Sequence, residues 1–213
     1  MSLSLPRRLM PLLISLVLIL GLAGPVRADA GRFLSSASSA ELQAEINSLQ
    51  STSDRSLSGD AQQRLDDLNR LAGAIARSDD RAQLTNASSH TVGVFLRFKK
   101  DRSGSPVALS LLGPGQQSDD DDELLGVYVP SQVGVQWEAG GSPASDAPRV
   151  ARVLEGQVLR LSDGAGENGA DLYSLNLPVF ALLDAKGAQA ITSDLPALSQ
   201  ADLDKLPATA PTD

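Results

Sequence analysis

The sequence Thr91-Val-Gly-Val-Phe-Leu-Arg-Phe-Lys99 decides the fold, because apolar residues recur at every second position from Val92 to Phe98. A period of two is typical of a β-strand that buries one face. Similar segments follow at short intervals, with turn residues between them. They are residues 107–111, 125–129, 133–137, 150–154 and 157–162, a long segment at 172–183 that Pro178 interrupts, and residues 188–192. The pattern predicts a mainly β fold, an antiparallel β-sandwich over residues 83–193.

The region upstream of the β segments has the apolar period of an α-helix. Ser38 followed by Glu41 matches a capping box, so one helix is expected over about residues 39–50 and a second from about residue 60 to residue 76. The apolar faces carry Leu42, Ile46 and Leu49 in the first helix, and Leu65, Leu68, Leu71, Ala72 and Ile75 in the second. Residues 39–78 are therefore predicted to form an α-helical hairpin. Two short helices cannot bury both faces on each other, so we expect them to pack on the sandwich or on a protein partner.

The first residues, 1–28, have the composition of a secretory signal peptide. Two consecutive arginines precede the apolar segment 9–23, and small residues surround a cleavage point after Ala28. Cleavage after Ala30 fits the same rule, and retention as an uncleaved anchor stays open. The apolar segment is too short to span a bilayer comfortably, so no integral membrane span is expected after cleavage.

Two further segments have compositions that argue against regular structure. Residues 29–38 are small and polar, and we expect them to be a flexible leader. Residues 194–213 are rich in proline, alanine and acidic residues. Apart from one or two helical turns within 199–206, they are expected to form a largely disordered acidic tail.

The overall composition excludes several kinds of partner and site. Removing the signal peptide leaves 15 basic and 26 acidic residues, a net charge of −11. Such a surface repels phosphate, so no nucleic-acid partner is expected. The absence of cysteine excludes disulfides and thiolate metal sites. Arginine outnumbers lysine by 14 to 4, which is typical of a GC-rich bacterial genome.

The start of the β region resembles a known class of fold. Leu84-Thr-Asn-Ala-Ser88, then Val92-Gly-Val94, then Leu112-Gly-Pro-Gly115 are similar to the opening of immunoglobulin-like β-sandwiches, and their spacing is closest to β-domains of the von Hippel–Lindau type. The resemblance covers about residues 83–137 and implies a sandwich. The hydroxyproline-pocket residues of that family have no counterpart here, so the resemblance implies no function.

Two acidic segments are candidate calcium sites. Their carboxylates belong to Asp119, Asp120, Asp121, Asp122 and Glu123 in the first segment, and to Asp163, Glu167 and Asp171 in the second. Calcium prefers several oxygen ligands at once, and the two segments would form one site if they converged at one end of the sandwich. The second segment departs from a calcium loop, since Asn168 stands at its sixth position and Ser174 at its twelfth. The alternative is a pair of solvated loops and no cofactor.

The remaining candidates concern catalysis and partner binding. His90 is the only histidine, and no Gly-x-Ser-x-Gly sequence supplies a nucleophile, so no catalytic residue is assigned. Phe95 lies on the polar face of its strand, beside Arg97 and Lys99, so another segment should cover it, and the helical hairpin could do so. The expected partner contacts are Leu65, Leu68, Ile75, Phe95, Arg97 and Lys99.

These observations favour an exported, soluble, non-catalytic binding or assembly module of a bacterial cell envelope, periplasmic or secreted. Its partner would be an envelope protein contacted through the helical hairpin. One alternative is a calcium-dependent adhesion or surface module that uses loops 119–123 and 163–171. A second is a hydrolase that uses acidic residues, although no pair of carboxylates stands out for that role.

Overall fold

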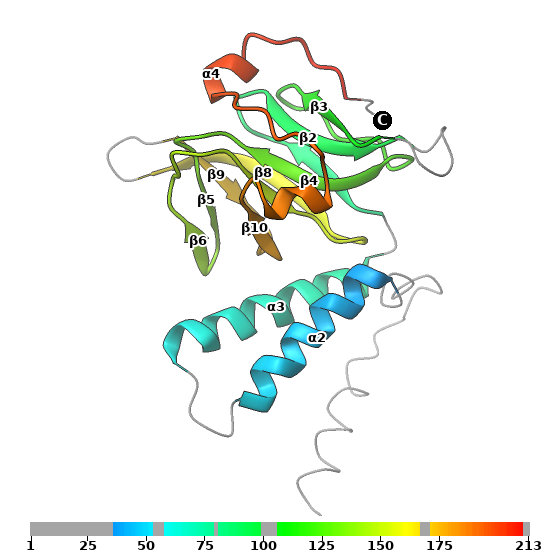
Figure 1. Ribbon diagram of the computed structural model, residues 1–213, viewed down its shortest axis with the longest axis vertical. Coiled ribbons are helices and arrows are strands. Elements are labelled where there is room, and N and C mark those ends of the chain that lie inside the picture. The colour runs from blue at the N-terminus through cyan, green and yellow to red at the C-terminus, as the bar shows by residue number, and fades with distance from the viewer. Residues whose placement is uncertain (1–35, 53–57, 79–80, 99–105, 167–170, 211–213) are drawn as a thin grey trace, which may run out of the picture. The chain divides into compact units, whose positions relative to one another are not determined.

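A computed structural model describes residues 36–52, 58–78, 81–98, 106–166 and 171–210 of the chain (Figure 1). The contacts divide the chain into two units, residues 1–30 and residues 31–213, and every structural statement below concerns the second unit. The expected signal peptide and the first seven residues of the expected leader lie outside the described residues.

The β region forms two sheets. Sheet A has the order β1-β8-β9-β5-β6, made of β1 (Gln83–Asn86), β8 (Val158–Ala165), β9 (Asp171–Leu175), β5 (Gly134–Trp137) and β6 (Gly140–Ser142). Sheet B has the order β10-β7-β4-β2-β3, made of β10 (Ala181–Leu183), β7 (Arg149–Arg152), β4 (Glu123–Val129), β2 (Val92–Arg97) and β3 (Ala108–Leu112). Neighbouring strands are antiparallel except in the pairs β1–β8 and β5–β9. The structure thus confirms the coarse prediction of a β-rich fold, with two mostly antiparallel sheets and a few helices.

Alternate side chains of both sheets meet in one apolar core. Val92, Val94 and Leu96 of β2 are completely buried, and Leu159 and Leu161 of β8 are at most 1% exposed in the same cluster. The alternation read in residues 91–99 therefore marks the side of β2 that faces sheet A. Burial of one face of each sheet supplies the main stabilising term of the fold.

The segment expected to be one long strand at residues 172–183 divides between the sheets. Its first part is β9 in sheet A and its last part is β10 in sheet B. Pro178 lies between β9 and β10, where the chain crosses from one sheet to the other. Proline cannot donate a hydrogen bond to a neighbouring strand, so the strand is interrupted at this point. The last expected strand, 188–192, is instead a short 3-10 helix (Gly187–Ala190). At the start of this helix the Asp184 side chain accepts a hydrogen bond from the Gly187 N–H at 2.8 Å.

The helical hairpin consists of α2 (Ala37–Thr52) and α3 (Gly59–Arg77). Figure 1 shows them as an antiparallel pair. The Ser58 hydroxyl caps α3 by accepting a hydrogen bond from the Ala61 N–H. The apolar faces of both helices form one cluster with Leu154 and Phe180 from the β region. The Arg64 guanidinium adds hydrogen bonds to the carbonyls of Val179 and Phe180.

The C-terminal segment is more ordered than its composition predicts. Residues 194–210, here called the C-terminal strap, include the capped helix α4 (Gln200–Leu203). Leu203 is fully buried, and Leu195 and Leu198 pack against the same cluster on the outer face of sheet B. Burial of these leucines stabilises a segment that is otherwise rich in proline, alanine and acidic residues. The described part of this region therefore differs from the expected disordered tail.

Candidate functional site

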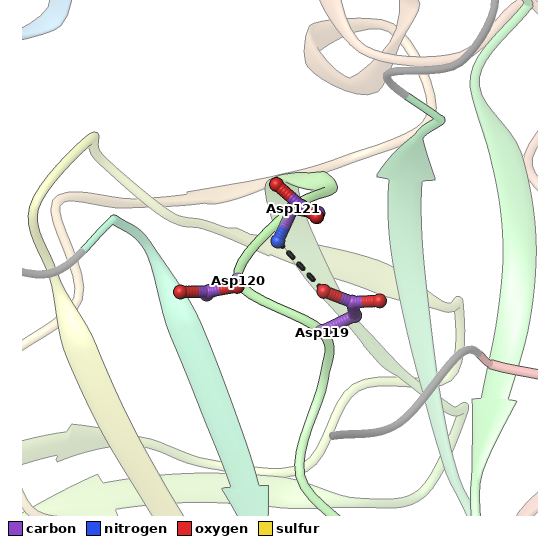
Figure 2. A group of neighbouring side chains, drawn as sticks. All are labelled: Asp119, Asp120 and Asp121. Atoms are coloured by element: carbon purple, nitrogen blue, oxygen red, sulfur yellow. Dashed lines mark hydrogen bonds between the residues drawn. The ribbon is translucent and has the colours of Figure 1, made fainter.

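The first acidic segment divides into three exposed or half-exposed aspartates and two engaged residues. Carboxylate oxygens of Asp119, Asp120 and Asp121 lie within 4.8 Å of one another (Figure 2). Asp119 also accepts a hydrogen bond from the Asp121 N–H at 2.7 Å. Asp122 is buried, and Glu123 forms an ion pair with Arg97 at 2.6 Å. Of the five carboxylates in this segment, those of Asp119, Asp120 and Asp121 are therefore the ones close enough together to bind a single cation.

The second acidic segment lies at the other end of strand β2. Both carboxylate oxygens of Asp163 accept from the Ser89 N–H, just before β2 begins, whereas Glu123 pairs with Arg97 where β2 ends. A strand of this length separates its two ends by roughly 20 Å. Asp163 and Glu123 therefore lie at opposite ends of β2, and the condition for one shared site is not met by these two residues. Glu167 lies outside the described residues.

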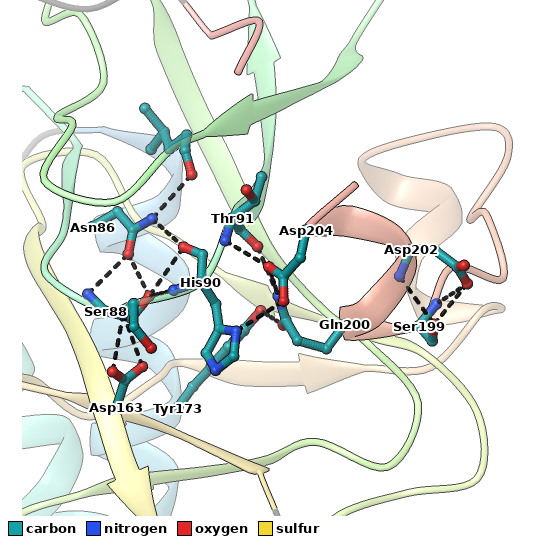
Figure 3. Close-up of polar contacts among 12 residues, drawn as sticks. Asn86, Ser88, His90, Thr91, Asp163, Tyr173, Ser199, Gln200, Asp202 and Asp204 are labelled. Atoms are coloured by element: carbon teal, nitrogen blue, oxygen red, sulfur yellow. Dashed lines mark hydrogen bonds and ion pairs between the residues drawn. The ribbon is translucent and has the colours of Figure 1, made fainter. Parts of the chain in front are cut away.

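A polar network surrounds the only histidine (Figure 3). The His90 Nδ1 lies 2.9 Å from a carboxylate oxygen of Asp204, and the other oxygen of Asp204 accepts from the Thr91 N–H at 2.8 Å. Gln200 donates to that same oxygen and to the Thr91 carbonyl, and it accepts the hydroxyl of the buried Tyr173. The network joins the C-terminal strap to the start of β2 and to β9.

The charges of this network shift the pKa values of its members. The hydrogen bond to Asp204 raises the pKa of His90 above 6.5, against an opposing effect of burial. Burial acts to raise the pKa of Asp204, but hydrogen bonds from His90, Thr91 and Gln200 together hold it below 3.8. Burial raises the pKa of Tyr173 far above its usual value, so this hydroxyl stays protonated and donates.

The Ser88 hydroxyl close to His90 is engaged in local hydrogen bonds. The Ser88 hydroxyl donates to the Asn86 side chain at 2.6 Å, and Asn86 in turn donates to the carbonyls of His90 and Leu112. Within the described ranges, the His90 ring forms its one hydrogen bond with Asp204. The arrangement is therefore a histidine–carboxylate pair to which no nucleophile is joined among those residues.

A groove of about 610 Å³ lies where the hairpin, sheet B and the 3-10 helix meet. Its charged lining residues are Glu41, Arg81, Arg97, Asp122, Glu123, Arg152 and Glu155, and its apolar lining includes Leu124, Leu125, Val153 and Ile191. Glu41 pairs with Arg152 at 2.6 Å, and this hydrogen bond lowers the pKa of Glu41. Among the described residues, neither Arg81 nor Glu155 forms an ion pair or a side-chain hydrogen bond. The groove therefore presents one cation and one anion that are free to bind.

The expected partner contacts do not form one surface. Leu65, Leu68 and Ile75 are buried against the β region of the same chain, with Leu68 and Ile75 at 0% exposure. Phe95 is 1% exposed, and its cover comes from the C-terminal strap and not from the hairpin. Arg97 lines the groove, while Lys99 lies outside the described residues.

Comparisons with family models, with curated proteins and with solved structures find no match to this chain. In the part of the chain that the structure describes, no helix combines the length and apolar character needed to cross a membrane.

Proposed function

We propose that this chain is an exported, non-catalytic binding module of the bacterial cell envelope, built on an immunoglobulin-like β-sandwich. The signal-peptide pattern of residues 1–28 supports export. The shared core of two mostly antiparallel sheets supports a sandwich. The observation that carries the binding role is the charged groove, because its lining combines side chains of both charges with apolar side chains.

The groove suits an extended segment of a protein partner. Its volume of about 610 Å³ is within the usual range of binding pockets. A polyanion would meet the four carboxylates of the lining, whereas a peptide carrying both signs of charge can match Arg81 and Glu155 at once. These two residues have no ion pair to break within the described chain, so each can form a new one without losing an old one.

The first test is a cross-linked pull-down of the tagged mature chain from its own envelope fraction, read by mass spectrometry. Arg81→Glu reverses the free cation of the groove, and Arg160→Glu makes the same change at an exposed position of β8 outside the groove. We expect one dominant protein that Arg81→Glu loses and Arg160→Glu retains. Its affinity for the purified chain, measured by calorimetry, should fall at least tenfold in the groove variant alone, which corresponds to about 1.4 kcal/mol.

Two outcomes would contradict the proposal. The first is a partner that both variants retain equally, which would move the contact away from the groove. The second is an empty pull-down from a well-folded protein, which would favour the calcium-dependent alternative built on Asp119, Asp120 and Asp121.

A further inference from the structure

The C-terminal strap is fastened to sheet B at three places along its length. Before α4, the Tyr128 hydroxyl lies 2.7 Å from the carbonyl oxygen of Pro196 and 2.8 Å from that of Leu198, which share its one hydrogen, and it accepts from the Leu198 N–H. Beyond α4, the N–H groups of Thr209 and Ala210 both lie 2.9 Å from the carbonyl of Leu111. The third place lies between these two, where Asp204 meets His90 and Thr91.

The strap covers an apolar surface that would otherwise face solvent. Phe95, Leu111, Tyr128 and Val150 point outward from sheet B and form one buried cluster with Leu203 of α4. Phe95 and Tyr128 contact each other edge to face, with ring centroids 6.4 Å apart. Ala188 and Ile191 also pack against this cluster, so release of the strap would remove one part of its cover, the part that Leu195, Leu198 and Leu203 supply.

We propose that His90 and Asp204 form a pH-dependent latch that holds the C-terminal strap closed over this face of sheet B. The proposal goes beyond the binding role of the groove and does not depend on it. Thr91 and Gln200 hold the Asp204 carboxylate in place through its other oxygen, so the charge of His90 acts on a fixed partner.

The charges around His90 all favour its protonated form. Asp204 comes from the strap, Asp163 from β8 and Asp171 from β9, and each acts to raise the pKa of His90. Lys205, next to Asp204 in sequence, is paired with Asp202. The ring is about one-third exposed, so the proton can exchange with solvent without unfolding of the sheet. His90 is the only side chain of the chain with an ordinary pKa near neutrality.

The direction of the effect follows from linkage. Because folding raises the pKa of His90 above 6.5, its stabilising contribution is complete below pH 6.5 and is lost as the pH rises through the folded-state value. The opposite holds for Asp204, whose contribution is lost only as the pH falls below 3.8. The latch is therefore closed most firmly in mildly acidic conditions and weakens as the pH rises above 6.5.

Hydrogen exchange of the mature chain, followed by mass spectrometry, tests this directly. Protection factors of peptides from residues 194–210 are compared at about pH 6 and about pH 8, because protection factors remove the intrinsic pH dependence of exchange. We expect protection of the strap to fall roughly two- to fivefold over this interval, the range of a partly exposed ion pair. In His90→Gln the dependence on pH should disappear, while protection of β2 and β4 stays unchanged.

Asp204→Asn provides a second variant of nearly identical shape. It keeps an oxygen for Thr91 and removes the charge that His90 meets, so the pH dependence should again disappear. Strap protection in the unaltered chain that is the same at both pH values would overturn the proposal. A pH dependence that persists in His90→Gln would do so as well, since it would assign the effect to another group.

Discussion

Tyr128 joins the C-terminal strap to sheet B through a single hydroxyl group. Its burial raises the pKa of that hydroxyl, so it remains a donor to the strap carbonyls. Tyr128→Phe keeps the ring against Phe95 but leaves the Leu198 N–H without its partner. We expect a loss of about 1–2 kcal/mol in the free energy of unfolding, measured with urea. An unchanged unfolding midpoint would show that the hydroxyl does not hold the strap.

Two glycines give a matched pair of substitutions with opposite expected signs. In Gly126→Ala the new Cβ would lie 2.5 Å from a methyl carbon of Val150, so we expect a loss of about 1–3 kcal/mol from overpacking. In Gly59→Ala the new Cβ meets nothing within 4 Å at the start of α3, so stability should rise by up to about 1 kcal/mol. Thermal unfolding measures both. A gain of stability in Gly126→Ala as well would mean that the packing around Gly126 relaxes to accept the new methyl group.

The fate of Phe95 shows what sequence can and cannot predict about one residue. The alternation of β2 correctly indicates that Phe95 lies opposite Val94 and Leu96 and needs a cover. The sequence does not indicate which segment supplies the cover, since apolar side chains in the hairpin and in the strap offer the same chemistry. Leu203, on a short helix among prolines and acids, gave too weak a periodic signal to be chosen.

At the scale of elements, the hairpin depends on the β region for its stability. Leu68 of α3 is completely buried in the cluster that also includes Leu154 and Phe180 of the β region. Leu68→Ala should lower the free energy of unfolding by about 2–5 kcal/mol, because it removes packed atoms and leaves a cavity. The control Leu206→Ala alters a side chain that is 43% exposed and should stay within about 0.5 kcal/mol. Urea titration measures both, and equal effects would indicate that the hairpin packs loosely.

The elements themselves were largely predictable, and the exceptions have identifiable causes. The helices α2 and α3 and the strand β2 follow their apolar periods. Strand β6 is not among the segments that the sequence predicts, because Gly140 and Gly141 carry no side chain from which a period could be read. Its backbone is nevertheless paired to β5, where Gly141 lies opposite Gln136. Pairing of this kind depends on tertiary context more than on propensity.

At the scale of the whole molecule, calcium should have little effect. With one ligand atom each, the three neighbouring aspartates supply three of the six to eight oxygens that calcium takes, and an oxygen of Asp119 already accepts a backbone hydrogen bond. Binding weaker than millimolar stabilises by less than about 0.4 kcal/mol at millimolar calcium. We therefore expect the melting temperature to rise by less than about 1 °C. A rise of several degrees, abolished by replacing Asp119, Asp120 and Asp121 with asparagine, would support the calcium-dependent module.

The candidate site was less predictable than the fold, because the groove is made by distant segments. Arg97 and Glu123 were singled out from local charge, but nothing in the sequence around Arg81 or Arg152 indicates that they line a common groove. The start of α2, the ends of β2 and β7 and the 3-10 helix reach one place only after both sheets have formed. A local sequence pattern does not show that these segments lie together in the fold. Their proximity follows from the registers of the paired strands.

The hydrogen bond between Tyr128 and Leu198 joins residues that are 70 positions apart. During synthesis, the outer face of sheet B therefore stays uncovered by the C-terminal strap until that segment has been made. Local hairpins such as β2–β3 can pair early, but long-range closure is slow and follows last. A polypeptide threaded through a narrow translocation channel benefits from such a delay, since a chain that has not yet locked its final tertiary contacts can still be passed through unfolded.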